Sequence, residues 1–320
     1  MKMRLLVHEH GTDRTEDARE QAGALGPAPR DQRPYVPSGV HLGAMNDLEL
    51  EYSPSSRVGG SAEPFVADYR ARSAAVRDEL GDRIVRLAGG SLLVAGEPNA
   101  PLLVFIHGGY WQALSAEESL YLATGALAQG WSYLAVEYTI APVGNLVAML
   151  AECHAVLSLV GPLVGPLVGS LVGSSPASSL CPQRVVLAGH SAGAHLAAMV
   201  SLVRPSPLPI DLVVLLSGVF DLRPLVRTSV NDPLGLDDSA ASSLSPLLLP
   251  HEGGSEAVIA WGDNETDAFK AQSGLYAAYL AARGVRVSTL ECAPRHHFDI
   301  VDDLVDPHTP LGRLTRGGSA

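Results

Sequence analysis

Cysteine is scarce in this chain of 320 residues. The three cysteines, Cys153, Cys181 and Cys292, lie far apart and form no CxxC pair. Neither a disulfide framework nor a zinc site is therefore expected from them. Free, buried thiols are typical of a reducing compartment, which favours a cytoplasmic location.

Positive charge is also in short supply. The chain has 22 Lys and Arg against 34 Asp and Glu, which gives a formal net charge of −12. An acidic surface repels the phosphates of nucleic acids and of anionic membranes, so neither is expected as a partner. The expected partner is a small-molecule substrate, and a homodimer is the assembly that we consider for the chain.

Long apolar runs are missing as well. No stretch reaches the roughly 18 apolar residues that a membrane span requires. The opening residues, MKMRLLVHEHGTD, contain only a short apolar run, whereas a secretory signal needs about 7–15 apolar residues. We therefore expect neither a membrane span nor export by this route.

What is present is a globular composition, with 47% hydrophobic and 18% charged residues. Short apolar runs alternate with helical patterns, which indicates an α/β fold with a mostly parallel sheet covered by helices on both faces. The expected strands are 102–106, 133–138, 185–188, 212–216, 257–261 and 285–290, with an antiparallel start over 83–95. The expected helices lie near 115–129, 146–158, 192–203 and 267–283.

The length of the chain suits one large domain, which we place at residues 45–308. Residues 1–44 are expected to be a disordered extension, because they are rich in charge, Gly and Pro and lack an apolar period; one hypothesis is that Met45 is the natural start. Residues 309–320 are expected to be a C-terminal tail. A four-residue repeat, LVGP or LVGS, fills 159–174, and its Gly and Pro predict a low-complexity loop over 159–179.

One pentapeptide carries the signature of a catalytic serine. Residues 189–193, GHSAG, fit the pattern G-x-S-x-G. They follow an expected strand and precede a helical run, which is the context that the pattern requires. A serine in such a tight turn is exposed, and the helix N-terminus adds the positive end of a dipole. The sequence therefore predicts Ser191 as the nucleophile of a serine hydrolase with the α/β-hydrolase fold.

A second motif, HGGYW at 107–111, ends the strand 102–106. In this place an α/β hydrolase holds backbone N–H groups that bind the oxyanion of the reaction intermediate. We expect an oxyanion hole made by Gly108, Gly109, Tyr110 and Ala192. Tyr110 and Trp111 offer aromatic faces to a substrate, and packing in the core is the competing interpretation.

The order Ser, acid, His that this fold requires is completed further along the chain. Two carboxylates, Asp263 and Glu265, follow the strand 257–261, and Glu265 is favoured with Asp263 as the alternative. After the last strand, His297 is the expected base and His296 the alternative. The acid would hold the imidazole tautomer and stabilise the imidazolium. No HExxH or similar metal spacing is present, so neither a metal nor a cofactor is expected.

Taken together, these motifs resemble the α/β-hydrolase type of kynurenine formamidase (arylformamidase). The resemblance runs from about residue 52 to 304. Besides HGGYW and GHSAG it includes EYSPSS at 51–56, VEYTIAP at 136–142, the long segment 217–234 and HHFDIVDDL at 296–304.

This resemblance implies hydrolysis of N-formyl-L-kynurenine to L-kynurenine and formate, by a Ser–acid–His triad without a metal. The family pattern places its acid four residues before the Phe of an F-x-x-Q-S element, which here is Glu265 before Phe269. Family members often carry Asp there, and this departure keeps Asp263 open.

Two other functions compete with this one. A broad carboxylesterase would use the same triad and would cleave p-nitrophenyl esters but not formylanilides. A non-catalytic binding protein of the same fold would usually lack a triad member, whereas each member has a candidate here.

Overall fold

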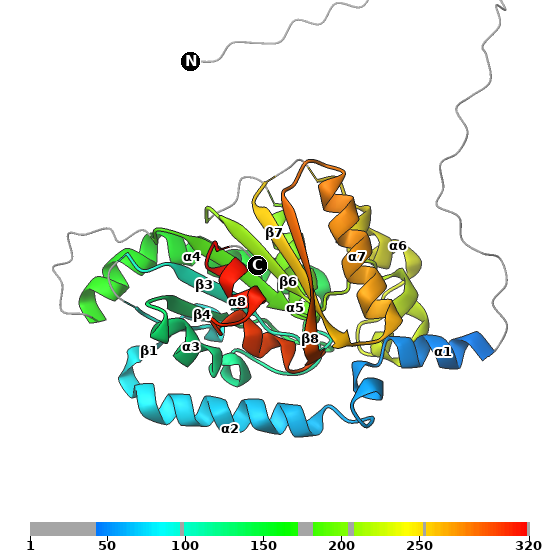
Figure 1. Cartoon of the computed structure of the whole chain (residues 1–320), viewed down its shortest axis with the longest axis horizontal. Helices are drawn as coiled ribbons and strands as arrows, with labels where there is room; N and C mark the ends of the chain where they lie inside the picture. Colours follow the sequence, from blue (N-terminus) through cyan, green and yellow to red (C-terminus); the bar gives the residue numbers. More distant parts are fainter. Residues whose placement is uncertain (1–42, 97–98, 172–181, 204–207, 252–253, 319–320) are drawn as a thin grey trace, which may run out of the picture. The chain divides into compact units, whose positions relative to one another are not determined.

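The computed structural model describes residues 43–96, 99–171, 182–203, 208–251 and 254–318. The expected extension over 1–44 lies outside these residues except for its last two. One eight-stranded sheet forms the centre of the domain (Figure 1). In spatial order its strands are β1 (Ile84–Arg86), β2 (Leu92–Val94), β4 (Ser132–Val136), β3 (Leu102–Ile106), β5 (Val185–His190), β6 (Leu212–Leu216), β7 (Glu256–Asn264) and β8 (Val287–His296).

The sheet is antiparallel at one edge and parallel elsewhere. The pairs β1–β2 and β2–β4 are antiparallel, and every neighbouring pair from β4 to β8 is parallel. The central strands β3, β4, β5 and β6 are buried along their whole length, as their apolar runs predict. The α/β-hydrolase fold expected from the sequence is thereby confirmed, including its antiparallel start.

Helices cover both faces of this sheet. Alternate residues of β3 point to opposite sides, so Val104 and Phe105 belong to two separate apolar clusters. One face is covered by α4 (Leu146–Leu171), α5 (Ala192–Ser201) and α7 (Asp267–Ala281), with α6 (Asp238–Ser243) beside them. The other face is covered by α2 (Glu63–Leu80), α3 (Leu122–Ala128) and α8 (Pro310–Thr315).

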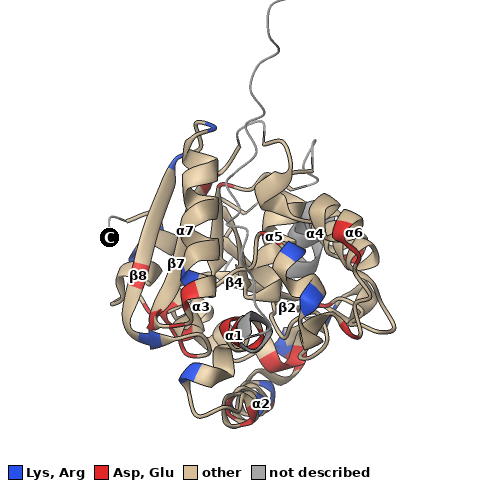
Figure 2. Cartoon of the chain, turned by 90° about the vertical axis from the view of Figure 1, so that its right-hand side faces the viewer, with Lys and Arg blue, Asp and Glu red and all other residues tan. Residues whose placement is uncertain are grey.

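Two helices that the sequence did not predict precede the sheet, α1 (Gly43–Glu51) and α2. Only Tyr69, Ser73, Val76 and Leu80 of α2 are buried, a narrow stripe in a segment that otherwise carries charges of both signs (Figure 2). A stripe this sparse gives a weak apolar period. The hydroxyl of Tyr69 donates to the carbonyl of Phe298, so α2 supports the loop that follows β8.

Helix α4 corrects the prediction of a loop over 159–179. It continues as a helix to Leu171, through most of the LVGx repeat, and residues 172–179 lie outside the described part of the chain. Its first half packs on the core through side chains such as Met149 and Cys153. Extending a helix that is already nucleated costs far less than starting one.

The C-terminal residues correct a second expectation. Residues 310–315 form α8 instead of a free tail, and Leu311 is completely buried in the apolar cluster of that face. The side chain of Thr309 accepts a hydrogen bond from the backbone N–H of Gly312 and so caps the helix. Burial of one leucine and a capped N-terminus anchor this segment.

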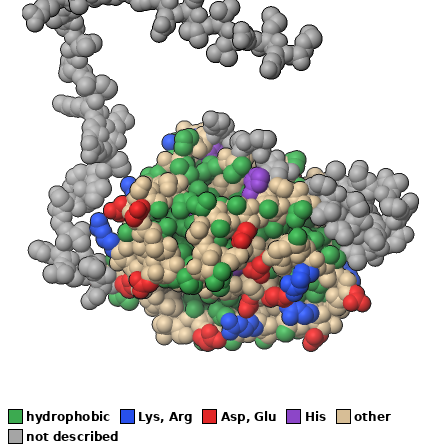
Figure 3. Space-filling model, turned by 180° about the vertical axis from the view of Figure 1, so that it is seen from behind, with side chains coloured by type: hydrophobic (Ala, Val, Ile, Leu, Met, Phe, Trp, Pro, Cys, Tyr) green, Lys and Arg blue, Asp and Glu red, His purple; other side chains and the backbone are tan. Residues whose placement is uncertain are grey.

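The surface is mixed in character. Seen from behind, apolar side chains cover much of the visible face and charged side chains gather in its lower part (Figure 3). Singly exposed apolar residues are normal on soluble domains. Among the helices of the described residues, none combines the length and apolar character needed to cross a bilayer.

Candidate active site

The residues singled out from the sequence meet at one edge of the sheet. Parallel strands place their carboxyl ends on the same side, where ligands of open α/β sheets bind. Here Ser191, Glu265 and His297 come directly after β5, β7 and β8, while β3 leads into the HGGYW loop. The serine and the histidine both line one cavity of about 340 Å³.

Ser191 occupies a strained turn between β5 and α5. Its φ is +54° and its ψ is −119°, values that L-residues rarely adopt. The turn is tight: a Cβ on Gly189 would lie 2.2 Å from the carbonyl oxygen of Gly193, and one on Gly193 would lie 2.0 Å from that of Ile106. Only glycine fits at these two positions, so the two glycines permit the elbow that presents the serine.

Backbone strain gathers around this point. Among the described residues, six that are not glycine have positive φ, and five of them surround the site: Tyr110, Trp111, Leu114, Ser191 and Ser217. Such conformations cost about 1–3 kcal/mol each and persist where the surroundings impose them. Their concentration at one edge of the sheet is typical of a functional site.

Glu265 is the carboxylate that meets the histidine. Its Oε2 accepts from Nδ1 of His297 at 3.0 Å, and its Oε1 accepts from the Ser217 hydroxyl at 2.5 Å and from the Gly262 backbone N–H at 2.7 Å. Glu265 is 1% exposed and His297 4%. A buried carboxylate with three donors is fixed in position, so the imidazole is held with Nδ1 toward the acid and Nε2 free to face the cavity.

The charge of Glu265 is maintained despite its burial. Desolvation alone would raise the pKa of this carboxyl. The attraction of His297 and the hydrogen bonds from His297, Ser217 and Gly262 outweigh it, and the pKa lies below its ordinary value. The group therefore remains a carboxylate near neutral pH.

The two alternatives kept open by the sequence lie elsewhere. Asp263 is exposed, and its carboxylate accepts from the backbone N–H of Arg295 at 2.9 Å. His296 accepts from the backbone N–H groups of Phe298 and Asp299 and packs edge-on against Phe65. Neither side chain is among the residues that line the 340 Å³ cavity.

The expected oxyanion donors lie beside the serine. In the described part of the chain, no hydrogen bond uses the backbone N–H of Gly109, Tyr110 or Ala192 as its donor. Gly108 approaches the elbow so closely that a Cβ there would be 3.2 Å from the Cβ of Ser191. Unused donors next to a nucleophile, one of them at the first turn of α5, can receive a developing negative charge.

The cavity wall is largely apolar and aromatic. The Tyr110 hydroxyl donates to the Tyr52 carbonyl at 2.5 Å, which fixes the ring at the cavity. Burial and the nearby Tyr52, Glu49 and Glu265 raise the pKa of Tyr110 well above its ordinary value, so the hydroxyl stays neutral. The described residues that line the cavity include the aromatic rings of Tyr52, Tyr69, Tyr110 and Phe298.

Trp111 corrects the expectation of an aromatic substrate contact. Its side chain is completely buried in the core and packs edge-on against His195 of α5, with ring centroids 5.1 Å apart. It does not line the cavity. Of these two neighbours, Tyr110 lines the cavity and Trp111 is buried in the core.

Several residues of the site gave no functional signal in the sequence. Ser217 lies in the segment that carries the family resemblance, but only the fold shows that it donates to Glu265. Tyr52 and Glu49 come from the N-terminal residues, more than 130 positions before Ser191. Arg223 does not line this cavity and pairs with Asp221 at 2.7 Å.

His190 supports the loop of the proposed base. Its Nε2 donates to the backbone carbonyl of His297 at 2.7 Å. Burial, together with repulsion from His297, lowers the pKa of His190 to about 3. Burial likewise lowers the pKa of His195, which donates to the Leu244 carbonyl, to about 4. Both histidines are therefore neutral donors at physiological pH.

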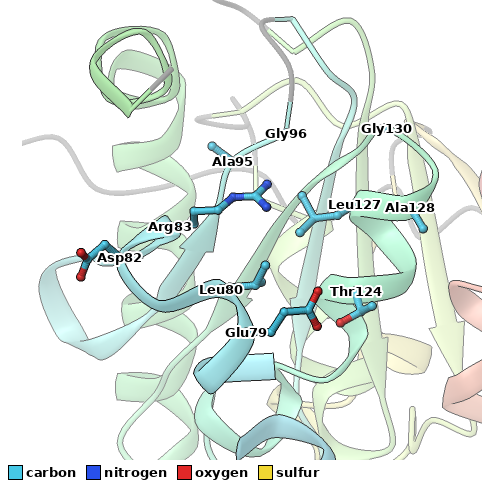
Figure 4. A pocket seen from close by; sticks show the side chains of 10 residues that line it. All are labelled: Glu79, Leu80, Asp82, Arg83, Ala95, Gly96, Thr124, Leu127, Ala128 and Gly130. Carbon is cyan, nitrogen blue, oxygen red and sulfur yellow. The ribbon is translucent and has the colours of Figure 1, made fainter. Parts of the chain in front are cut away.

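A second cavity lies at the opposite end of the strands. Its volume is about 650 Å³, and it adjoins Gly96 after β2 and Gly130 before β4. Figure 4 shows Glu79, Asp82, Arg83 and Thr124 as its polar side chains. The described residues that line it include no serine, cysteine or histidine. Although larger, this cavity lacks a nucleophile and a base, so the cavity at Ser191 is the candidate active site.

Within the described ranges, no group of three or more His, Cys, Asp or Glu is placed to hold a metal ion.

Sheet order, serine elbow and Ser–His–Glu arrangement together define an α/β hydrolase, and a family model for the alpha/beta hydrolase fold matches residues 103–298. Kynurenine formamidase of Danio rerio is 32% identical over 296 residues, covering 85% of this chain and 95% of that protein. Kynurenine formamidase of Salmo salar is 36% identical over 228 residues, covering 68% and 72%. The chain thus belongs to the kynurenine formamidase family of α/β hydrolases.

A solved structure shares the fold over a similar length. It is a protein from Silicibacter sp. tm1040, provisionally assigned as a thioesterase, with 27% identity and a TM-score of 0.67. The match covers 84% of this chain and 99% of that protein. The architecture described above is therefore also found in a solved structure.

Replacing Gly193 tests the elbow. Gly193→Ala would force a methyl group against the carbonyls of Ile106 and His107, so we expect a loss of about 1–3 kcal/mol in the free energy of unfolding and a large loss of hydrolase activity. Gly274→Ala is the matched control: apart from its own helix backbone, no atom lies within 4 Å of its Cβ position in α7, and we expect a gain of about 0.5–1 kcal/mol. Urea unfolding measures both, and equal effects would contradict the steric account.

The buried histidines predict a pH-dependent stability. Because the fold lowers both pKa values from 6.5 to about 3 and about 4, the unfolded chain binds protons that the folded chain does not. Stability is complete above pH 6.5 and falls as the pH drops, by about 1.4 kcal/mol per pH unit for each histidine. Unfolding at about pH 7 and about pH 5 should show a smaller difference for His195→Gln than for wild type. The exposed His308 provides the control, and His308→Gln should keep the wild-type slope.

Proposed function

We propose that this protein hydrolyses N-formyl-L-kynurenine to L-kynurenine and formate, a step of tryptophan catabolism. The observation that carries the proposal is the meeting of Ser191, His297 and Glu265 at one edge of the sheet, in a chain of the kynurenine formamidase family. Nucleophile, base and acid come from three different strand ends, as hydrolysis through an acyl-enzyme requires.

In the first half of the reaction Ser191 is the nucleophile. Its Oγ attacks the formyl carbon while Nε2 of His297 takes its proton. The hydrogen bond from Nδ1 to Glu265 keeps the imidazole in the tautomer that can accept this proton, and the carboxylate stabilises the imidazolium that forms. The imidazolium then protonates the aniline nitrogen, the C–N bond breaks, and L-kynurenine leaves a formyl-serine behind.

The second half releases formate. His297 removes a proton from water, which attacks the formyl carbon, and returns the proton to Ser191 as formate departs. In both halves the carbonyl oxygen carries negative charge, and the N–H groups of Gly109, Tyr110 and Ala192 are proposed to bind it, with Gly108 shaping the loop. Since these donors are built into the backbone, they need no reorganisation during the reaction.

The pocket suits an aromatic amine. The ring of Tyr110 is fixed by its hydrogen bond to Tyr52, and Phe298 adjoins the base. Aromatic rings in contact favour offset or edge-on packing, worth about 0.5–1.5 kcal/mol beyond the burial of apolar area. An aryl formamide would gain this contact, whereas a simple aliphatic ester would not.

A cytoplasmic location fits the state of the cysteines. Cys153 and Cys292 are free and buried. Burial raises the pKa of Cys292 to about 12 and that of Cys153 further, so both remain unreactive thiols. Cys181 lies outside the described residues.

Ser191→Ala tests the mechanism directly. We expect kcat/KM for N-formyl-L-kynurenine to fall by about 10³-fold or more, because no other group can form the acyl-enzyme. Hydrolysis of p-nitrophenyl acetate, followed in parallel, should fall with it. Fast ester cleavage with negligible formamidase activity in the wild type would instead assign the same triad to a carboxylesterase, and full activity of Ser191→Ala would reject the mechanism.

A pair of amide substitutions tests the acid. Glu265→Gln preserves the size of the side chain but removes the charge that stabilises the imidazolium, so kcat should drop by about 10²–10⁴-fold. Asp263→Asn removes a charge two residues away and should change kcat by less than about threefold. Circular dichroism would check that both variants are folded. A larger loss with Asp263→Asn would exchange the two roles.

A further inference from the structure

The cavity at Ser191 has an unusual balance of charge. Among the described residues that line it, Glu49 carries the only carboxylate, and there is no lysine or arginine. Glu49 comes from α1, whose residues include three acids and no base (Figure 2). Glu265 lies behind the base and is already engaged in three hydrogen bonds. The negative charge presented to a bound molecule therefore comes from Glu49.

Glu49 is held in a defined position. Its Oε2 accepts from the backbone N–H of Ser229 at 3.0 Å, and its Oε1 accepts from the hydroxyl of the same serine. Ser229 begins the short helix Ser229–Asn231 and itself lines the cavity. Each carboxylate oxygen can accept more than one hydrogen bond, so both retain the capacity for a further donor.

The charge of Glu49 acts on the aromatic wall of the cavity. Its charge is one of those that act on the hydroxyl of Tyr110, the ring proposed to contact the aryl group. In the described residues Glu49 forms no ion pair with a lysine or arginine. A half-buried carboxylate without a cationic partner attracts a ligand cation.

N-Formyl-L-kynurenine carries such a cation. Its aromatic ring carries the formamide and, at the adjacent position, an amino-acid chain. This chain ends in an α-ammonium group and an α-carboxylate group. We propose that Glu49 binds the α-ammonium group of the substrate while its formyl group lies at Ser191. The inference rests on the proposed function and identifies a specificity residue for it. Since no lysine or arginine lines the described wall, the α-carboxylate is left toward solvent, and selectivity depends on the amine.

The test compares two ligands that differ only in this group. One is N-formyl-L-kynurenine, and the other is its desamino analogue, in which hydrogen replaces the ammonium. In wild type we expect KM for the analogue to be about tenfold higher, the worth of one hydrogen bond between charged groups in a half-exposed site. Glu49→Gln, which can still bond to Ser229, should raise KM for N-formyl-L-kynurenine by about tenfold and leave KM for the analogue within about twofold.

Asp47→Asn is the matched control, because it removes the same charge from the same helix at a residue that does not line the cavity. It should change neither KM. Equal effects of Glu49→Gln on both ligands, or no effect, would overturn the proposal, since a purely structural clamp on Ser229 cannot distinguish an amine from a hydrogen.

Binding separates this inference from the proposed function. Calorimetry on Ser191→Ala gives the Kd of both ligands without turnover, in the presence or absence of the Glu49→Gln substitution. A Kd difference between the ligands that disappears with Glu49→Gln supports the ammonium site even if the wild type hydrolyses no formamide. Hydrolysis of N-formyl-L-kynurenine without such a difference would retain the proposed function and reject the role of Glu49.

Discussion

The close contact between the serine elbow and the neighbouring strand is the constraint on which the site depends. Gly193 lies so near the Ile106 carbonyl that no side chain fits, and this contact sets the start of α5 against the end of β3. As a result, the backbone of Gly109 and Tyr110 and the N-terminus of α5 come to lie around one point. Ser191 is held there in a conformation it would not adopt alone, because the parallel sheet fixes both ends of the turn.

The base and its acid are held in place by hydrogen bonds to a buried carboxylate rather than by close packing. Glu265 stays charged in the interior because His297, Ser217 and Gly262 each donate to it. Such a group is costly to bury without partners and rigid once they are present. The donors arise from the ends of β6, β7 and β8, so the sheet itself determines the orientation of the base.

The chemistry of the triad is general, and the residues that would make it selective come from another part of the chain. Tyr52 and Glu49 precede the sheet and contact the site only because α1 and α2 lie near its active edge. The Tyr110 ring is fixed by the carbonyl of Tyr52, and the base loop is supported by Tyr69 and His190. In the proposed function, hydrolysis and substrate choice therefore belong to different segments of one domain.

The sequence by itself determined the α/β-hydrolase fold, the nucleophile candidate and the base candidate, because local context decides them: a strand, a glycine-bounded serine and a helix are adjacent in the chain. It favoured Glu265 as the acid but left Asp263, two residues away, as an open alternative. The irregular register between Gly262 and Asn264 decides which carboxylate turns inward. Likewise, only the tertiary structure placed Trp111 in the core, extended α4 through most of the LVGx repeat and brought Glu49 to the cavity. Such outcomes depend on contacts between distant segments, and local propensity does not encode them.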